Sequence, residues 1–409
     1  MAVNLTPPDP AKLLAVPGVE LGSTAAGIRR RGGRDLMLIR LAAGSRVAGV
    51  FTRNGFAAAP VQVCRRRLAA GGAIRALVTN AGSANCGTGA AGVRDAERTC
   101  AAVARALGCA ADEVLPFSTG VILEPLPVGK IEAALERCVA ALGAANWADA
   151  AASIMTTDTV PKAASRAAEI DGRRIVVTGM AKGVGMIQPD MATMLAYVAT
   201  DCAVSQGALD RLVREAAEAS FHRVTVDGDT STNDSFVLIA TGQAGNRALA
   251  GHDGAGYAAL KRAVVEVARE LAQAIARDGE GATKFITIRV AGAASEREAV
   301  RVAKSIAHSP LVKTAFFASD PNLGRLLMAI GNAGIEVLDV SRVALWLGDV
   351  QVIEGGGRAA DYREEDGARV MRPAEIGVRV ELGRGGAEAT VWTCDFSYDY
   401  VKINAEYRT

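Results

Sequence analysis

Residues 181 to 202 read Ala-Lys-Gly-Val-Gly-Met-Ile-Gln-Pro-Asp-Met-Ala-Thr-Met-Leu-Ala-Tyr-Val-Ala-Thr-Asp-Cys and comprise a loop together with the apolar segment that follows it. Apolar runs at Ile175 to Thr178 and at Thr193 to Ala199 predict a buried strand on either side. The two glycines early in the loop permit backbone angles closed to other residues, and Pro189 stiffens it. The pattern predicts a constrained loop that ends at Thr193, where the second strand begins.

Thr193 has two interpretations. A threonine at the start of a strand is most simply explained because β-branched residues suit a pleated surface. In the chemical interpretation, the Thr193 hydroxyl attacks the preceding carbonyl of Ala192, and hydrolysis of the resulting ester leaves Thr193 as a new amino terminus. The released α-amine, with a reference pKa of about 7.7 to 8.0, then serves as the base for its own hydroxyl. No histidine is needed.

The composition limits the class of protein. The chain has 409 residues, of which 50% are hydrophobic, enough for two domains or one large one. Its 46 basic and 44 acidic residues give a formal net charge of +2, so we expect no nucleic-acid partner. The N-terminus lacks a signal-peptide pattern, and no apolar run reaches the roughly 18 residues of a membrane helix. We therefore expect a cytoplasmic protein without a membrane partner.

Metal sites and disulfides are not expected. The seven cysteines and three histidines are scattered, without a C-x-x-C pair, so both a disulfide framework and a zinc site are disfavoured. The acidic run from Asp227 to Asp234 resembles a calcium loop only faintly, because it lacks flanking helices and the glutamate at the twelfth position. We expect no metal and no cofactor.

The rest of the chain alternates between two patterns of apolar residues. Strands are predicted at 36–41, 46–51, 74–79, 113–117, 235–240, 285–290 and 311–317, and helices at 90–107, 128–143, 145–154, 206–220 and 256–276. The C-terminal run from Asp395 is aromatic and strand-like, so we expect it to be docked, whereas chain ends are commonly frayed. The alternation predicts an α/β (mixed α+β) fold with helices packed on sheets.

The central loop resembles a known self-cleavage motif. Met186-Ile187, Pro189 and Met191-Ala192-Thr193-Met194-Leu195 look like the motif of the ornithine acetyltransferase family, the bifunctional glutamate N-acetyltransferases of arginine biosynthesis. The resemblance extends from about Leu14 to Thr409. A carboxylate at Asp190, where the family more typically has asparagine, would slow cleavage or raise the pKa of the neighbouring amine. The chain also departs from the family pattern at Ser83, Leu123, Val184 and Leu323.

The resemblance implies roles for individual residues. Thr193 would be the nucleophile, released by cleavage of the Ala192–Thr193 bond, and Thr119 with Gly120 would form the oxyanion hole. Lys182 would receive the substrate α-carboxylate, and Glu280 would receive the ammonium group of ornithine. The implied substrate contacts are Thr156, Lys182, Thr193, Glu280, Asn404 and Thr409. Without the resemblance, Thr-Gly reads as a turn, and the lysine and glutamate read as solvated side chains.

Two loops are expected near this site. Asn80 to Gly89 reads on physical grounds as a turn between a strand and a helix, and the resemblance implies that it borders the active site. For Asp227 to Asp234 the resemblance implies a hydrogen-bonded turn that supports the new N-terminus.

The implied reaction moves an acetyl group from N2-acetylornithine to glutamate through an acetyl-threonine intermediate, which gives ornithine and N-acetylglutamate. Use of acetyl-coenzyme A as a second donor stays open. The resemblance also implies two mixed domains and two fragments, 1–192 and 193–409, assembled as a heterotetramer with two copies of each. Two alternatives remain: an N-terminal-threonine amidase or aminopeptidase that transfers the acyl group to water, and a non-catalytic amino-acid-binding module with an uncut chain.

Overall fold

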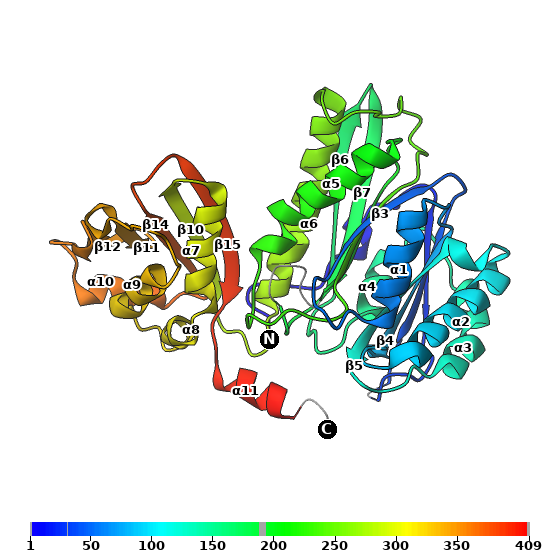
Figure 1. Cartoon of the computed structure of the whole chain (residues 1–409), viewed down its shortest axis with the longest axis horizontal. Helices are drawn as coiled ribbons and strands as arrows, with labels where there is room; N and C mark the ends of the chain where they lie inside the picture. The colour runs from blue at the N-terminus through cyan, green and yellow to red at the C-terminus, as the bar shows by residue number, and fades with distance from the viewer. Residues whose placement is uncertain (1, 31, 188–193, 407–409) are drawn as a thin grey trace. The chain divides into compact units, whose positions relative to one another are not determined.

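The computed structural model describes residues 2–30, 32–187 and 194–406, and the chain divides into two compact units (Figure 1). The larger unit comprises Pro7–His222 and Asp229–Ala272; the smaller comprises Met1–Thr6, Arg223–Gly228 and Gln273–Thr409. Both contain sheets and helices, which confirms the predicted mixed α/β fold. The division predicted at residue 192 concerns cleavage, which these units do not address, and it stays a prediction.

One sheet of the larger unit has four strands. They run in the order β1 (Val19–Thr24), β2 (Leu36–Leu41), β4 (Ala76–Ser83) and β5 (Val114–Val121). β4 and β5 are parallel, and α2 (Gly89–Leu107) connects them. One face of this sheet packs against α2 and α3 (Val128–Ala140), where Leu38 and Val78 meet Val103 and Ile131. α1 (Ala59–Ala70), which we did not predict, contacts β5 and α2.

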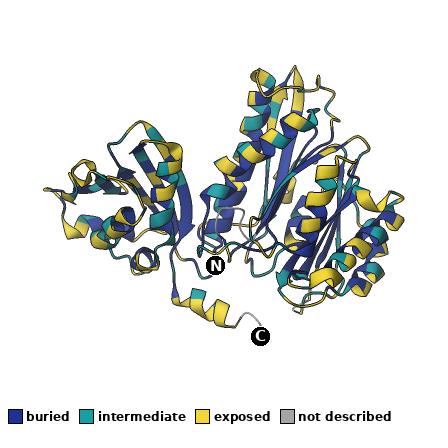
Figure 2. Ribbon diagram, viewed as in Figure 1, coloured by how far each residue is buried: buried dark blue, intermediate teal, exposed yellow. Residues whose placement is uncertain are grey.

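The second sheet of the larger unit has five strands. Its order is β3 (Arg46–Phe51), β9 (Ser235–Ala240), β8 (Leu195–Thr200), β7 (Arg173–Lys182) and β6 (Lys162–Ile170). α5 (Gln206–Ala219) contacts β3 and β9, and α6 (Ala255–Arg277) places Val267 and Leu271 beside Gly179 of β7. Every residue of β8 and β9 is buried, as expected for strands covered on both faces (Figure 2).

The two sheets of the larger unit share one hydrophobic core. Ile39, Leu77 and Phe117 of the four-stranded sheet belong to the same buried cluster as Tyr197 and Ile239 of the five-stranded sheet. α4 (Trp147–Ser153) contributes its fully buried tryptophan to this cluster. The larger unit is therefore layered as helices, sheet, sheet and helices. This packing brings the ends of strands from both sheets close together.

The smaller unit is built on a six-stranded sheet. The strands run in the order β13 (Gly357–Arg358), β12 (Val350–Glu354), β11 (Ala344–Leu347), β14 (Glu375–Glu381), β10 (Phe285–Ala293) and β15 (Ala387–Cys394). Its helices are α7 (Glu296–His308), α8 (Pro310–Phe317), α9 (Leu323–Gly331), α10 (Glu364–Met371) and α11 (Tyr398–Ala405). α7 contacts β10 and β15, and its Val302 and Ile306 join Ile288 in the core.

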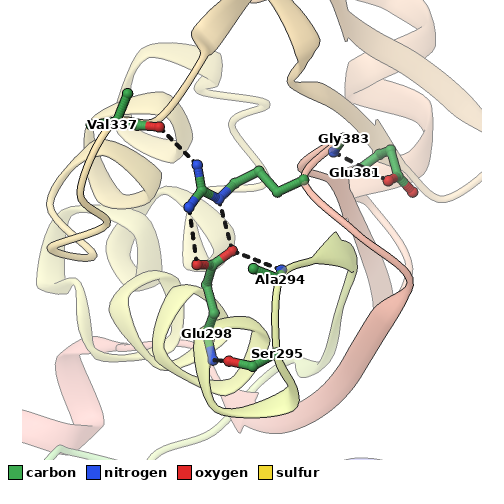
Figure 3. A network of polar contacts seen from close by, with 7 residues as sticks. Ala294, Ser295, Glu298, Val337, Glu381 and Gly383 are labelled. Atoms are coloured by element: carbon green, nitrogen blue, oxygen red, sulfur yellow. Dashed lines mark hydrogen bonds and ion pairs between the residues drawn. The ribbon is translucent and has the colours of Figure 1, made fainter.

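The start of α7 is held by a polar network (Figure 3). Ser295 caps the helix by accepting the backbone N–H of Glu298 at 3.2 Å. The Glu298 carboxylate accepts the N–H of Ala294 at 3.1 Å and the guanidinium of Arg384 at 2.9 Å. Burial alone would raise the pKa of Glu298, but these donors hold it below its ordinary value. The network fixes the connection from β10 to α7.

Two predictions about the smaller unit are wrong. The strand predicted at 311–317 is the helix α8, because Ser309 caps the segment by accepting the N–H of Val312, and Pro310 occupies the first turn. The strand-like C-terminal run contains the helix α11, none of whose residues is buried, so its prediction as a strand is wrong. The start of the run is docked as expected, because Asp395 accepts the backbone N–H groups of Thr283 and Lys284, each at 2.8 Å. None of the described helices is long and apolar enough to cross a membrane.

Candidate active site

Thr119 and Gly120 lie at the end of β5, where that strand meets β4. Gly120 has φ of +134°, and a Cβ atom there would lie 2.3 Å from the carbonyl carbon of Gly82. Gly82 has φ of +125°, and the register of β4 against β5 shifts at this point. Only residues without a side chain permit this close approach. The two glycines therefore shape the backbone beside the Thr119 hydroxyl.

Lys182 approaches Thr119 from the other sheet. It is the last residue of β7 and is 2% exposed, and its Nζ donates to Thr119 Oγ1 at 3.2 Å. A hydroxyl that accepts a hydrogen bond from an ammonium group can still donate its own proton elsewhere. The structure thus joins Thr119 and Lys182, two residues predicted to belong to one site.

The Thr156 segment is tied to the same strand end through Asp158. The N–H of Thr156 donates to Asp158 Oδ2 at 3.1 Å, and the N–H of Gly183 donates to Asp158 Oδ1 at 2.8 Å. Lys162, the first residue of β6, donates its Nζ to Oδ1 at 2.8 Å. Burial alone would raise the pKa of Asp158, yet the charges of Lys162 and Lys182 and these hydrogen bonds hold it well below its ordinary value.

Asp234 lies next to the start of β8. Its Oδ1 accepts the N–H of Met194 at 3.0 Å, while its Oδ2 is buried and has no hydrogen-bond partner among the residues that the structure describes. Burial raises the pKa of this carboxyl well above its ordinary value, despite the Met194 N–H and the charge of Lys182. Ala192 and Thr193, the predicted scission pair, lie outside the described residues.

The asparagine-rich loop meets the end of β5. Asn233 donates from Nδ2 to the carbonyl oxygens of Ala84, at 2.7 Å, and Ser118, at 2.9 Å. Ser118 in turn donates from Oγ to Asn80 Oδ1 at 2.6 Å. β4 extends through Asn80 to Ser83, which we predicted as part of the loop, and residues 84–89 together with the turn that ends at Asp234 flank the Thr119 position.

Two other predicted site residues contact each other in the smaller unit. Asn404 of α11 donates from Nδ2 to Glu280 Oε2 at 2.9 Å, and Glu280 is 7% exposed. Thr409 lies outside the described residues. Thr119, Gly120, Thr156 and Lys182 belong to the larger unit.

Neither Asp158 nor Asp234 was predicted as a site residue, although Asp234 ends the turn that was expected to support the new N-terminus. A signal for Asp158 was present in Lys162, because a lysine in an apolar segment requires a carboxylate nearby when its side chain is buried. Asp234 directly precedes β9, whose residues after Ser235 are all apolar, so a charged residue is also unexpected there. Within the described ranges, no group of three or more histidine, cysteine or acidic residues could hold a metal ion.

The family of the chain follows from its match to a family model. The model of the ArgJ family matches residues 20–409, nearly the whole sequence. The chain belongs to the ArgJ family. This confirms the resemblance drawn from the central loop. ArgJ membership supports acetyl transfer in arginine biosynthesis and an acetyltransferase as the class of enzyme.

Solved structures similar to this ArgJ-family chain include an ArgJ protein and an ornithine acetyltransferase. The bifunctional arginine-biosynthesis protein ArgJ of Bacillus halodurans is 38% identical, with 51% of this chain and 97% of that chain covered and a TM-score of 0.49. The ornithine acetyltransferase of Mycobacterium tuberculosis, solved with ornithine, is 34% identical. The match covers 44% of this chain and 94% of that enzyme's chain, with a TM-score of 0.36. An L-aminopeptidase of Ochrobactrum anthropi is 13% identical over 68% of this chain and 88% of that chain, with a TM-score of 0.39.

Proposed function

We propose that this ArgJ-family protein is a glutamate N-acetyltransferase that transfers acetyl groups from N2-acetylornithine to glutamate. The observation that carries the proposal is the 3.2 Å hydrogen bond from Lys182 to Thr119 beside the Gly82–Gly120 contact. At this point the Thr119 hydroxyl can donate its proton, and Gly120 carries no side chain that could cover its backbone. A tetrahedral intermediate of acyl transfer requires such donors.

The nucleophile in this proposal is Thr193 after cleavage of the Ala192–Thr193 bond. The Thr193 hydroxyl attacks the Ala192 carbonyl, the C–N bond breaks as the nitrogen takes the hydroxyl proton, and water hydrolyses the ester. The products are the fragments 1–192 and 193–409. The contact between Asp234 and the N–H of Met194 supports this assignment, because it holds the residue that follows the nucleophile.

Acetyl transfer then proceeds in two half-reactions. The Thr193 oxygen attacks the acetyl carbonyl of N2-acetylornithine, while the α-amine accepts its proton and passes it to the departing ornithine nitrogen. Thr119 and Gly120 stabilise the oxyanion. The glutamate amine next attacks the acetyl ester, loses a proton to the α-amine and leaves as N-acetylglutamate, and Thr193 is regenerated. One amide replaces another, so the acetyl group is conserved at little cost in free energy.

Substrate recognition follows from charge. Lys182, with the adjacent Thr156 segment, is assigned to the α-carboxylate that both amino acids carry. Glu280 is assigned to the side-chain ammonium group of ornithine, with Asn404 and Thr409 as further contacts. We propose no cofactor, a cytoplasmic location and a heterotetramer with two copies of each fragment. An assay of glutamate acetylation with acetyl-coenzyme A as the sole donor decides whether the enzyme also accepts this donor.

Intact mass spectrometry combined with initial-rate kinetics tests the proposal. The purified protein is expected to give two fragments that meet at residues 192 and 193, and double-reciprocal plots are expected to be parallel. Thr193→Ala should leave one continuous chain without transferase activity, because both the nucleophile and its amine are lost. Thr314→Ala, on the exposed surface of α8, is the matched control and should behave as the wild type.

Two outcomes would contradict the proposal. Full activity in a continuous chain would remove the base from the mechanism. Ornithine release from N2-acetylornithine at equal rates with and without glutamate would instead indicate a hydrolase. Rapid release only with glutamate supports transfer.

A further inference from the structure

Asp158 is the most completely satisfied carboxylate near the candidate site. Its side chain and that of Lys162 are both 0% exposed, and their charged atoms lie 2.8 Å apart. Each oxygen also accepts a different backbone N–H, from Gly183 at Oδ1 and from Thr156 at Oδ2. A buried ion pair is stable only when its remaining hydrogen-bonding positions are also satisfied, and here the two additional donors come from separate segments of the chain.

The two backbone donors belong to segments that the site requires. Gly183 directly follows Lys182, the last residue of β7, and Thr156 precedes β6. β6 and β7 are antiparallel neighbours, with Lys162 opposite Ala181. Asp158 therefore joins the start of one strand to the end of the next, at the point where β7 presents the Lys182 ammonium to Thr119.

The charges at this point make the Lys182 position sensitive to Asp158. Lys162 and Lys182 are two buried cations, each 2% exposed, and Asp158 is the carboxylate that contacts Lys162 and the backbone beside Lys182. Removing the negative charge would leave the cations to repel each other in a medium that screens poorly. The geometry of the Lys182 to Thr119 hydrogen bond therefore depends on the balance between repulsion of the two lysines and their attraction to Asp158.

We propose that Asp158 is a positioning residue for acetyl transfer, which sets the direction in which the Lys182 ammonium meets the Thr119 hydroxyl by holding the Thr156 and Gly183 segments together. This inference rests on the proposed function. Asp158 does not touch the reacting atoms in this scheme. It acts through Lys182, and its effect is therefore expected on kcat in both half-reactions, which share the same oxyanion donors.

The experiment compares Asp158→Asn, Lys162→Met and the double variant with the wild type. Asn has only one acceptor oxygen, so it cannot accept both backbone N–H groups, whereas Lys162→Met keeps both acceptors. Asp158→Asn alone removes the carboxylate that pairs with the buried Lys162 and can fail to fold. The double variant removes both charges and is expected to recover the melting temperature. Its kcat per cleaved chain is expected to fall by about 10- to 100-fold.

The expected pattern separates positioning from simple ion pairing. Lys162→Met should keep kcat within about threefold of the wild type, and KM should change less than kcat in the double variant. Slow self-cleavage at an unchanged melting temperature also supports the proposal, because scission forms an oxyanion of its own. A double variant with wild-type kcat, or a loss in Lys162→Met equal to that in Asp158→Asn, would overturn it.

A second variant keeps the test decisive if the double variant does not fold. Asp158→Glu retains the charge and the pairing with Lys162 but moves both oxygens by about one methylene, roughly 1.5 Å. Its kcat should fall although the ion pair is preserved, and wild-type kcat in this variant would reject the inference. The wild-type assay with N2-acetylornithine and glutamate tests the proposed function separately, since its failure would be seen before any variant is compared.

Discussion

At the scale of single residues, the contact between Gly82 and Gly120 has the clearest chemical consequence. The two residues come from parallel strands whose register shifts where they meet. Both glycines have positive φ angles, and a Cβ atom on Gly120 would lie 2.3 Å from the carbonyl carbon of Gly82. There is therefore no space for a side chain. The proposed oxyanion site therefore depends on two absent side chains, which a search for reactive groups does not detect.

Gly120→Ala is expected to reduce both stability and catalysis. The new methyl group must displace the Gly82 backbone, and overpacking of this kind costs about 1–3 kcal/mol. We expect kcat to fall by about 100-fold, because a shift near 1 Å misplaces the proposed oxyanion donors. Chemical denaturation and steady-state kinetics measure the two effects.

Gly129→Ala is the matched control for this substitution. Gly129 lies in α3, where nothing is within 4 Å of a Cβ atom, so alanine should leave kcat unchanged and add up to about 1 kcal/mol of stability. Wild-type kcat in Gly120→Ala would argue against an oxyanion site at this strand end.

The predictability of the site also differs from residue to residue. Thr119 and Lys182 were predicted through resemblance to a family, and the structure shows their side chains in contact. Asp158 escaped notice as a site residue because, besides its ion pair with Lys162, it accepts the backbone N–H of Gly183, which lies 25 residues away. A sequence pattern reports side-chain types at fixed spacings, and it carries no direct signal for a backbone N–H from another strand.

At the scale of secondary-structure elements, α5 and α6 are linked by Glu215. Its carboxylate accepts hydrogen bonds from Arg211 at 2.7 Å on its own helix and from Tyr257 at 3.1 Å on α6, and it pairs with Lys261 of α6 at 2.9 Å. Burial alone would raise the pKa of Glu215, but these three partners lower it to about 2. The ionised carboxylate therefore stabilises the pairing of the two helices.

Glu215→Gln should make stability less dependent on pH. The folded-state pKa lies below the unfolded value of about 4.3, so the stabilisation is present above that pH and is lost as pH falls towards about 2. We expect the variant to lose roughly 1–2 kcal/mol at pH 7, a value reduced for partial solvent screening. Denaturant unfolding at several pH values measures the difference, which should shrink below pH 4.

The control for this prediction is Glu136→Gln on the exposed surface of α3. It should change the free energy of unfolding by no more than about 0.5 kcal/mol at any of these pH values. A constant difference between wild type and Glu215→Gln from pH 7 to pH 2 would show that charge is not the source of the stabilisation.

Secondary-structure elements that are fully buried were predicted more accurately than exposed ones. β8 and β9 were predicted well because strands covered on both faces are continuous apolar runs. α8 was mistaken for a strand because a short apolar run has no clear period, and its capping serine was overlooked. α11 was misread because aromatic and β-branched residues favour strands, although here they lie on an exposed helix.

At the scale of the whole molecule, the proposed scission falls inside the larger unit. The fragment 1–192 would contain β3, β6 and β7, whereas 193–409 would contain β8 and β9. In the five-stranded sheet β9 and β8 lie side by side, between β3 on one side and β7 with β6 on the other, with β9 paired to β3 and β8 paired to β7. Cleavage therefore would not create two independent proteins.

We expect the fragments to stay together under native conditions. Separating them would break two strand ladders and expose the buried residues of β8 and β9. Size-exclusion chromatography should give one peak that contains both fragments, and they should separate only in denaturant. Separation of the fragments in native buffer would contradict the shared sheet as the source of cohesion.

The cysteines make it possible to time the opening of each unit separately. All seven thiols are unpaired, and six of them are buried, with Cys109 partly exposed. Burial raises the pKa of Cys138 to about 12 and that of Cys394 to about 11, so neither reacts readily while it is enclosed. Cys394 belongs to the smaller unit and Cys138 to the larger. The alkylation rates of these two sulfurs, measured by peptide mass spectrometry, would report separately how often each unit opens locally.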